Sequence, residues 1–600
     1  MFGRVLVLVL LVALNFVFRL GFTAAQKRNI ADIELDEEHD TVSLQACYVE
    51  DLRNIREYSQ NPLSVIISHC FLQELPNAIF IRFSDLKTLE ICDSRLNNLQ
   101  DFALNGLRSL EVLNFARNNL TAVKSWSDHN LYSLLSLDLR RNQLKTINTQ
   151  SFKRFPNLTK LNLAGNLISE IPEGTLQVVP HLKCVNLARN LLTSIEETTL
   201  KGLTKLTHAF FNHNQITYID FFAFIGNSHL KSLQLQENQI SIFETDLLSN
   251  LPRLAFLNIS HNLLEKVTEN TFKRSADLRL LDLSYNKIEN FHEDSLKGLS
   301  SLEVFNASHN QLSQLNKYMF KDFSAVQVLV LAGNQLTYVE NKLFEYTPHI
   351  EILNLSSNAI ADIEPNIFED VNRLHSLDLS HNQLAEDAFL GPISNLQCLN
   401  LSHNLFQRMN VSQLATVEHV ELYENPWKCQ FLILELMKLN RNVHYAKNYE
   451  VHSTDSILNT RGIECTDERG KLRDIVLVEN AASPDYNSLE YHRYRLFHEA
   501  HIDTRPIQDN FDTKSTILWL MSGAFVVFGA FKLIQLILRH SEHQSEKWRL
   551  AQHVSRQQSG NVIMYSSKTP TASVPAVNSA GFIFPCTHPP GMRQYTPSIS

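Results

Sequence analysis

An asparagine recurs every 24 residues through the middle of this chain, and the spacing holds over twelve occurrences. The positions are Asn118, Asn142, Asn166, Asn190, Asn214, Asn238, Asn262, Asn286, Asn310, Asn334, Asn358 and Asn382. Apolar residues flank each one at fixed offsets, as in Leu134-x-x-Leu137-x-Leu139-x-x-Asn142-x-Leu144-x-x-Ile147. Such a period predicts units that bury their apolar faces only by stacking on their neighbours.

The register extends beyond this run at both ends. We call the position of the recurring asparagine in each repeat the slot. Upstream, Ser94 and Cys70 occupy the slot, and downstream the spacing shortens to 22 residues at Asn404 and 21 at Asn425. The frame therefore holds 16 repeats over residues 62–425, 14 of them with Asn in the slot. It resembles the leucine-rich repeat, L-x-x-L-x-L-x-x-N-x-L, in which Cys is also found in the slot. The resemblance implies an α/β solenoid, curved like a horseshoe, with a parallel sheet on its concave side.

Two columns of the frame are expected to face inward. Each L-x-L pair predicts a short strand, and strands of successive repeats stack about 4.8 Å apart into one sheet, roughly 75 Å long. The slot Asn should turn inward and bond backbone groups that the turn leaves unpaired. Ten residues beyond the slot, a second column is expected to fill the convex side. Its aromatic members are Phe80, Phe152, Phe224, Phe272, Phe320, Phe344 and Phe368.

The two ends of the chain predict secretion and membrane insertion. Arg4 and the apolar run Val5–Leu14 are typical of a signal peptide, residues 1–25, with a retained signal anchor as the alternative. Residues 514–538 are long enough to cross a bilayer as one helix. Within them the apolar run Ser515–Leu538 has a single charge, Lys532, which would either snorkel or pair with an acidic partner helix. The basic flank after this span predicts a type I protein of the plasma membrane with extracellular repeats. The tail, residues 539–600, is rich in Ser, Thr and Pro and is predicted to be disordered.

Cysteines mark the C-terminal end of the repeats. An N-P-W-x-C motif at Asn425–Cys429 opens residues 426–513, a cap and juxtamembrane stalk that also contains Cys465. The motif resembles the C-terminal flanking domain of extracellular leucine-rich-repeat proteins. The resemblance implies a Cys429–Cys465 disulfide, although Phe431 stands where the family has another cysteine.

The N-terminal side, residues 26–61, is expected to cap the other end of the solenoid. Cys47, Cys70 and Cys92 form an odd set in which at most one pair can form. We favour the pair Cys47–Cys70. With eight cysteines in 600 residues, the chain has no dense disulfide framework.

Residues just before the slot Asn in the early repeats are candidates for ligand recognition. Arg117, Arg140, Arg141 and Arg189 form a basic patch there, with Asp138 nearby. Planar guanidinium groups suit carboxylate, sulfate or phosphate partners. The alternative is ordinary solvated charge. We expect this concave face, in repeats three to eight, to bind the ligand.

The later repeats carry histidine at the same place. These residues are His213, His261, His309, His381 and His403. Such a ridge suits a pH sensor or a metal strip, but Ser-His-Asn is a common filler of this repeat, and we predict no metal site. Five apolar strand residues lie beside it: Phe256, Leu280, Val304, Val328 and Ile352. They suit a protein-binding stripe or reflect strand propensity alone.

Seven N-x-S/T sequons predict N-glycosylation of an extracellular region. They are Asn119, Asn157, Asn258, Asn306, Asn354, Asn400 and Asn410. Four of them, from Asn258 to Asn400, lie in the concave strands. Glycans at those four would screen the apolar stripe and leave the arginine-rich half open.

No motif for catalysis or for a cofactor is found, because the chain lacks a Gly-rich phosphate loop, a metal-spaced Cys/His cluster and a nucleophile elbow. A net charge of −9 without any Lys/Arg block argues against nucleic acid as a partner. The tail is too short for a signalling domain, so signalling would require a cytoplasmic adaptor. The sequence predicts a non-enzymatic protein that recognises a protein ligand or cell-surface protein, including a copy of itself.

Over about 400 residues, from Pro62 to Cys465, the chain is similar to extracellular leucine-rich-repeat membrane proteins. Insect adhesion proteins and Toll-like ectodomains are of this kind, although this chain lacks a TIR domain. A weaker likeness links it to the leucine-rich immune proteins of mosquitoes. The resemblance implies a receptor or adhesion protein. The alternatives are an innate-immunity receptor or co-receptor that signals through a partner, and a membrane-tethered ligand or decoy.

Overall fold

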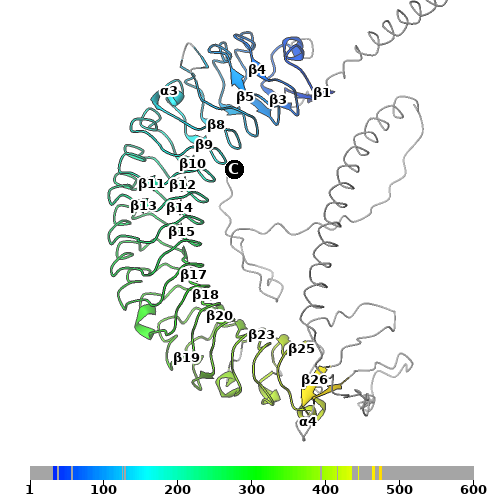
Figure 1. Ribbon diagram of the computed structural model, residues 1–600, viewed down its shortest axis with the longest axis vertical. Helices are drawn as coiled ribbons and strands as arrows, with labels where there is room; N and C mark the ends of the chain where they lie inside the picture. The colour runs from blue at the N-terminus through cyan, green and yellow to red at the C-terminus, as the bar shows by residue number, and fades with distance from the viewer. Residues whose placement is uncertain are drawn as a thin grey trace, which may run out of the picture. The chain divides into compact units, whose positions relative to one another are not determined.

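The described residues form a curved solenoid with one strand per repeat on its inner side (Figure 1). The computed structural model describes residues 32–36, 40–55, 59–124, 126–127, 130–391, 393, 395–414, 416–434, 443–444, 463–466 and 472–475. Within them the leucine-rich-repeat solenoid of about 16 turns predicted from the sequence is confirmed. The predicted signal peptide, membrane span and tail lie outside the described residues. In the described ranges, no helix is long and apolar enough to span a bilayer.

The inner side of the solenoid is a single sheet of 19 strands. Each strand pairs in parallel with the strand of the next repeat, as Leu113 pairs with Leu137 and Leu137 with Leu161. The parallel strands are β2 (Thr41–Gln45), β3 (Ser64–Ser68), β5 (Thr88–Cys92), β7 (Val112–Asn114), β8 (Ser136–Asp138), β9 (Lys160–Asn162), β10 (Cys184–Asn186), β12 (His208–Phe210), β14 (Ser232–Gln234), β15 (Phe256–Asn258), β16 (Leu280–Asp282), β17 (Val304–Asn306), β18 (Val328–Val330), β20 (Ile352–Asn354), β22 (Ser376–Asp378), β23 (Cys398–Asn400), β24 (His419–Glu421) and β25 (Val443–His444). At the N-terminal end, β1 (Asp32–Asp36) pairs antiparallel with β2.

Each strand ends in a left-handed turn that aims the slot Asn inward. In β8, Leu137 points into the core and is 1% exposed, while Ser136 and Asp138 are only partly buried. Three residues after the strand, Arg141 has a φ of 53°. The residue before the slot has a positive φ in repeat after repeat, and glycine takes the position twice, as Gly165 and Gly333. Glycine and, among the other residues, Asn, Asp and His adopt this conformation most readily. The backbone therefore explains part of the histidine enrichment at this position.

The slot asparagines form a continuous hydrogen-bonded ladder along the core. Asn286 donates through Nδ2 to the carbonyls of Leu283 at 3.0 Å and Ile259 at 3.1 Å, and its Oδ1 accepts from the N–H of Leu264 at 3.0 Å. The carbonyl of Leu283 also accepts from Asn310, so each amide bridges two carbonyls and neighbouring amides share one. The same pattern runs from Asn118 to Asn425.

The convex side is built from turns and short elements over the phenylalanine column. All seven phenylalanines of that column are buried, which confirms their predicted packing role. The short helices are η1 (Asp51–Asn54), α3 (Thr149–Phe152), η2 (Lys317–Phe320), η3 (Ala388–Leu390) and η4 (Val411–Leu414). Two-residue strands pair in parallel as β4 (Glu74–Leu75) with β6 (Asn98–Leu99), β11 (Ser194–Ile195) with β13 (Tyr218–Ile219), and β19 (Tyr338–Val339) with β21 (Asp362–Ile363).

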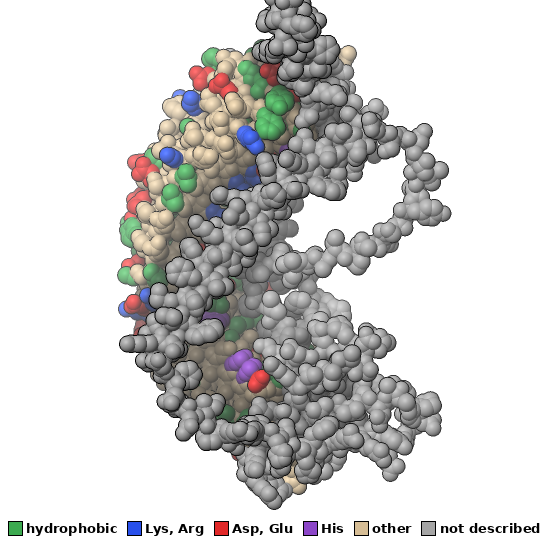
Figure 2. Space-filling model, turned by 45° about the vertical axis from the view of Figure 1, so that its right-hand side comes forward, with side chains coloured by type: hydrophobic (Ala, Val, Ile, Leu, Met, Phe, Trp, Pro, Cys, Tyr) green, Lys and Arg blue, Asp and Glu red, His purple; other side chains and the backbone are tan. Residues whose placement is uncertain are grey.

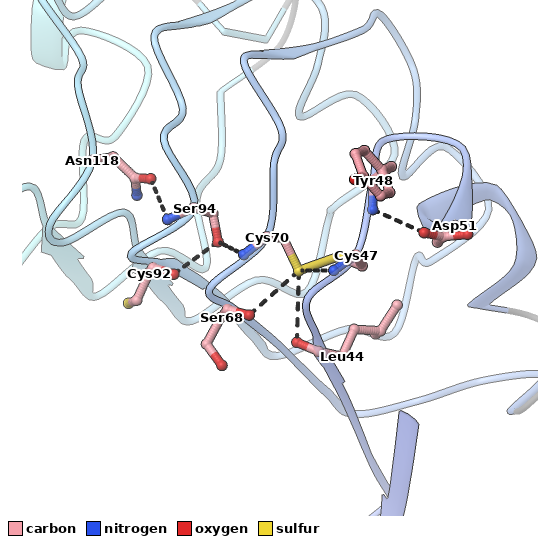
Figure 3. Close-up of a disulfide and its surroundings, with 9 residues drawn as sticks. All are labelled: Leu44, Cys47, Tyr48, Asp51, Ser68, Cys70, Cys92, Ser94 and Asn118. Atoms are coloured by element: carbon pink, nitrogen blue, oxygen red, sulfur yellow. Dashed lines mark hydrogen bonds between the residues drawn. A yellow bond between two sulfur atoms is a disulfide. The ribbon is translucent and has the colours of Figure 1, made fainter. Parts of the chain in front are cut away.

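A disulfide closes the N-terminal end of the ladder, and Figure 3 shows its surroundings. Cys47 is bonded to Cys70, which confirms the favoured pairing. Cys70 stands in the slot, and its Sγ accepts the N–H of Cys47 at 3.0 Å. In the next slot, the Ser94 hydroxyl accepts from the N–H of Cys70 at 3.2 Å and donates to the carbonyl of Cys92 at 2.8 Å. The asparagine ladder then begins at Asn118, whose Oδ1 accepts from the N–H of Ser94.

The C-terminal end of the core is covered by an aromatic stack and a second disulfide. Trp427 is 1% exposed, stacks between Phe406 and Phe431, and donates through Nε1 to the carbonyl of Leu422 at 3.0 Å. The predicted disulfide between Cys429, at the start of α4 (Cys429–Leu434), and Cys465 is confirmed. Cys465 belongs to β26 (Ile463–Thr466), which pairs antiparallel with β27 (Leu472–Ile475).

Candidate functional site: the arginine ridge of the concave face

The four candidate arginines follow the strands of the early repeats and form one ridge. We call Arg117, Arg140, Arg141 and Arg189 the arginine ridge. All four side chains are exposed. The φ values of Arg117, Arg141 and Arg189 lie between 53° and 57°, so these three occupy the same place in the frame. Because the neighbouring slot Asn is anchored in the core, the backbone holds the start of each arginine side chain at the rim of the sheet.

Two of the arginines are neutralised by carboxylates of the same surface. The Nε of Arg117 donates to both carboxylate oxygens of Asp93, at 2.7 and 2.9 Å, and this bond raises the pKa of the arginine further. Arg140 faces Asp138 across 3.4 Å, and its backbone N–H donates to the same carboxylate at 2.9 Å. Burial raises the pKa of Asp138, while the bond from the Arg140 backbone and the positive charge of that arginine lower it.

Arg189 belongs to a polar chain that crosses three repeats. Its Nη2 lies 3.1 Å from Nε2 of His213. The other ring nitrogen of His213 contacts the carboxylate of Glu237. The three side chains occupy the same place in successive repeats, 24 residues apart. The guanidinium of Arg189 keeps donors for a ligand, but its position is already fixed by this chain.

Arg141 differs from the others because its side chain forms no ion pair or hydrogen bond with any described residue. At the equivalent place in the next repeat is Gly165, and a Cβ there would lie 3.3 Å from Cγ of Arg141, so the arginine side chain packs beside the glycine. Gly165 therefore offers this guanidinium no polar side chain. A carboxylate or sulfate at this point would meet a guanidinium that no described carboxylate neutralises, and it can be bound through two parallel hydrogen bonds.

In the later repeats, stacked aromatic rings occupy the frame position that the arginine ridge occupies in the early repeats. His261 stacks on Tyr285, and Tyr285 on His309, each with ring centroids 4.1 Å apart. His381 stacks on His403 at 3.9 Å. Burial lowers the pKa of His309, with a smaller contribution from the charge of His261. Among the residues that the structure describes, no three or more His, Cys, Asp or Glu side chains are grouped as metal ligands.

Figure 2 shows basic side chains on the upper half of the face it presents and histidines further down. The early repeats of this surface therefore carry basic side chains, and the later repeats carry stacked rings. The apolar stripe is half-buried from Phe256 to Val328, and its last member, Ile352, is buried. The stripe is thus less open than the sequence predicts, because neighbouring strand side chains cover part of each residue.

The predicted sequons fall into two groups. Asn119, Asn157 and Asn410 are exposed. Asn258, Asn306 and Asn400 are buried in concave strands, Asn354 is half-buried, and each accepts the backbone N–H two residues on. The amide nitrogen of Asn306 also donates to Asp282 at 3.1 Å.

Glycan occupancy should depend on both exposure and the bonds of the amide nitrogen. We expect high occupancy at Asn119 and Asn410 and low occupancy at the concave sequons and at Asn157. A glycan on Asn306 would disrupt its bond to Asp282, and one on Asn157 would disrupt its bond to the carbonyl of Tyr132 at 2.9 Å. Glycopeptide mass spectrometry of protein from animal cells measures each site. Full occupancy at Asn306 would contradict the expectation and would restore the screening of the apolar stripe.

Asp282 provides a test of buried charge on the concave face. Its carboxylate is 6% exposed and accepts from the N–H and hydroxyl of Ser284 at 3.0 and 2.7 Å. Burial raises its pKa above the ordinary value of 3.8. The folded state therefore binds more protons than the unfolded state above that value, so stability falls as the pH rises through this window.

Asp282→Asn should stabilise the protein at neutral pH, since Asn258 and Asn306 make the equivalent turn bonds in the adjacent repeats. The gain should shrink as the pH is lowered, because protonation of the wild-type carboxyl removes its buried charge. Thermal unfolding of both proteins at neutral and at acidic pH measures the difference. A variant that is less stable than the wild type at neutral pH would contradict the burial argument.

Sequence reasoning placed the arginines but missed the pairing that distinguishes them. Asp93 with Arg117, and His213 with Glu237, are complementary polar side chains one repeat apart, so the 24-residue period contained this signal. Gly165 was also missed. A glycine among charged residues at one place of the frame leaves the neighbouring side chain without a polar partner there.

Comparison with known proteins agrees with this fold. The leucine-rich-repeat family model matches residues 124–168, 156–216, 210–264, 254–312 and 324–384. No curated protein matches the chain by sequence. A leucine-rich-repeat protein of Leptospira interrogans is 25% identical, with a TM-score of 0.57 over 66% of this chain and 98% of that one. The Drosophila Toll–Spatzle complex in its glycosylated form contains a chain that is 22% identical, with a TM-score of 0.57 over 63% of this chain and 52% of that one. This chain thus spans about half of that second chain.

Proposed function

We propose that the protein is a non-enzymatic recognition protein of the cell surface that binds a protein ligand through the arginine ridge. The observation that carries this proposal is Arg141, a guanidinium that forms no ion pair or side-chain hydrogen bond with any described residue and is held at the rim of the sheet beside Gly165. An acidic side chain of a partner protein can pair with it. A solenoid of the same fold is solved together with Spatzle in the Toll–Spatzle complex, which supports a protein partner for this solenoid.

The proposal includes membrane anchoring through residues 514–538, with the repeats outside the cell. The disulfides Cys47–Cys70 and Cys429–Cys465 support an oxidising compartment for the repeats, since structural disulfides are rare in the cytosol. Adhesion, to a second copy or to another surface protein, is our first choice of role. An innate-immunity receptor or co-receptor, and a tethered ligand or decoy, are the alternatives.

A binding experiment with cells tests the proposal. The secreted region, residues 26–512, is clustered and applied to cells with and without the same protein on their surface. Selective binding to the expressing cells would establish self-recognition and adhesion. Selective binding to another cell type would instead establish a heterophilic partner. Binding to no cell type in a broad panel would contradict recognition of a surface protein.

A further inference from the structure

The opposite edge of the concave sheet carries a second basic surface. Lys183, Lys231 and Arg279 stand immediately before strands β10, β14 and β16. Lys205 and Arg253 stand three residues before β12 and β15. We call these five residues the basic edge. The arginine ridge follows the strands, so the two surfaces flank the sheet on its two sides.

The basic edge provides one cation per repeat on a rigid support. The backbone N–H groups of Lys183, Lys231 and Arg279 each donate to a carbonyl of the preceding repeat, at 2.8, 2.8 and 2.9 Å. Because neighbouring strands lie about 4.8 Å apart, five repeats place these charges over roughly 19 Å. All five side chains are exposed.

Little negative charge accompanies these cations. The two positions that carry them contain no Asp or Glu from Asn157 to Ala255. Carboxylates appear at the two borders. Glu111 pairs with Lys87 at 3.4 Å at one border, and at the other Asp277 shares the repeat of Arg279, which pairs with Glu303 at 3.0 Å. The positive region is therefore confined to a short run of repeats rather than spread over the whole edge.

A groove opens at the N-terminal end of the basic edge. It has a volume of about 530 Å³, and its lining includes Tyr132, Leu135, His181, Lys183 and Lys205, together with Glu111 at its border and Asn157. Nζ of Lys205 lies 3.1 Å from Nδ1 of His181. Tyr132 is 63% exposed and Leu135 is 43% exposed. A flat exposed ring beside ammonium groups provides both an apolar face for a sugar ring and charge for its anionic substituents.

We propose that the basic edge binds a linear sulfated polysaccharide, a ligand distinct from the protein partner of the arginine ridge. The regular cation spacing fits a chain with anionic groups on successive rings, and lysine is a compact point charge that suits sulfate. A single-stranded nucleic acid is the competing polyanion. Such binding normally combines the positive groove with several aromatic side chains for base stacking, whereas the two positions of the basic edge contain no aromatic residue from Asn157 to Arg279. The inference rests on the proposed extracellular location of the repeats.

The test measures heparin binding by the full chain, purified in detergent from animal cells, at several salt concentrations. The probes are heparin, desulfated heparin and single-stranded RNA. The variant Lys183→Gln/Lys205→Gln/Lys231→Gln removes three charges of the basic edge. The matched control Lys266→Gln/Lys273→Gln/Lys287→Gln removes three exposed lysines elsewhere. Thermal unfolding checks that both variants are folded.

We expect wild type and control to bind heparin alike, and the edge variant to bind at least tenfold more weakly at physiological salt. The slope of log affinity against log salt should fall by about two in the edge variant, as three released counterions predict. Equal affinity in edge variant and wild type, equal loss in both variants, or undiminished binding of desulfated heparin would overturn the proposal. RNA that outcompetes heparin would also overturn it and would identify a nucleic acid instead.

A variant of the arginine ridge distinguishes failure of this proposal from failure of the proposed function. Arg140→Gln/Arg141→Gln should leave heparin affinity within about twofold of wild type while weakening the binding of the protein partner. Heparin binding that is lost only in this variant would place the polyanion on the ridge and would contradict the basic edge.

Discussion

Replacing Asn286 by Ala should lower the free energy of unfolding by about 3 kcal/mol. The N–H of Leu264 loses its acceptor and is left unpaired in a closed core. The carbonyls of Ile259 and Leu283 each lose one donor but keep another, from Asn262 and Asn310. One orphaned buried donor costs about 1–3 kcal/mol, and the two lost bonds to half-satisfied carbonyls add about 1 kcal/mol.

Hydrogen exchange is the measurement suited to a solenoid, because each repeat contacts only its neighbours and damage is local. The amide of Leu264 should lose protection in Asn286→Ala, whereas amides several repeats away should keep theirs. Asn290→Ala is the matched control, since Asn290 is exposed. It should change stability by less than about 0.5 kcal/mol. Unchanged protection of Leu264 in Asn286→Ala would contradict the ladder.

The second large effect is expected on ligand binding. Arg140→Glu/Arg141→Glu should weaken binding of the clustered extracellular region to its target cells at least 100-fold. The variant replaces the guanidinium of Arg141 by a carboxylate. It also places a second carboxylate at position 140, beside Asp138, whose Oδ2 lies 3.4 Å from Nε of Arg140 in the wild type. Like charges brought together at an interface cost several kcal/mol, which is enough to abolish detectable binding.

Two further variants are needed to interpret this result. Lys145→Glu/Lys153→Glu changes the charge equally at exposed lysines away from the ridge and should retain full binding. Arg141→Glu alone removes the arginine that forms no ion pair with a described residue, so folding should be unaffected and binding should still fall at least tenfold. Retained binding in Arg141→Glu, with a normal melting temperature, would disprove the role of Arg141 in binding.

The fold could be predicted in detail because its information is local and repeated. One period located the strands, the inward Asn and the phenylalanine column. Among Cys47, Cys70 and Cys92 the sequence favoured the pair Cys47–Cys70 but left the other pairs open. The site could be predicted only in outline. Whether Arg117 is free or neutralised depends on the rotamer that it and Asp93 adopt across repeats. The burial of Asn258 likewise depends on how closely neighbouring strand side chains pack, which the period does not encode.

The hydrogen bonds of the slot asparagines run in one direction along the solenoid. This direction determines where the chain can be truncated. Each slot residue completes the hydrogen bonding of the repeat before it, as Asn425 does for the N–H of Phe406. Removing repeats from the C-terminal end therefore strips a bond from the last repeat that is kept. A truncated protein that ends just past a slot asparagine keeps this donor of the preceding repeat paired. A truncated protein that ends a few residues earlier leaves that backbone N–H unpaired at the exposed C-terminal end of the core, where a neighbouring chain can bind.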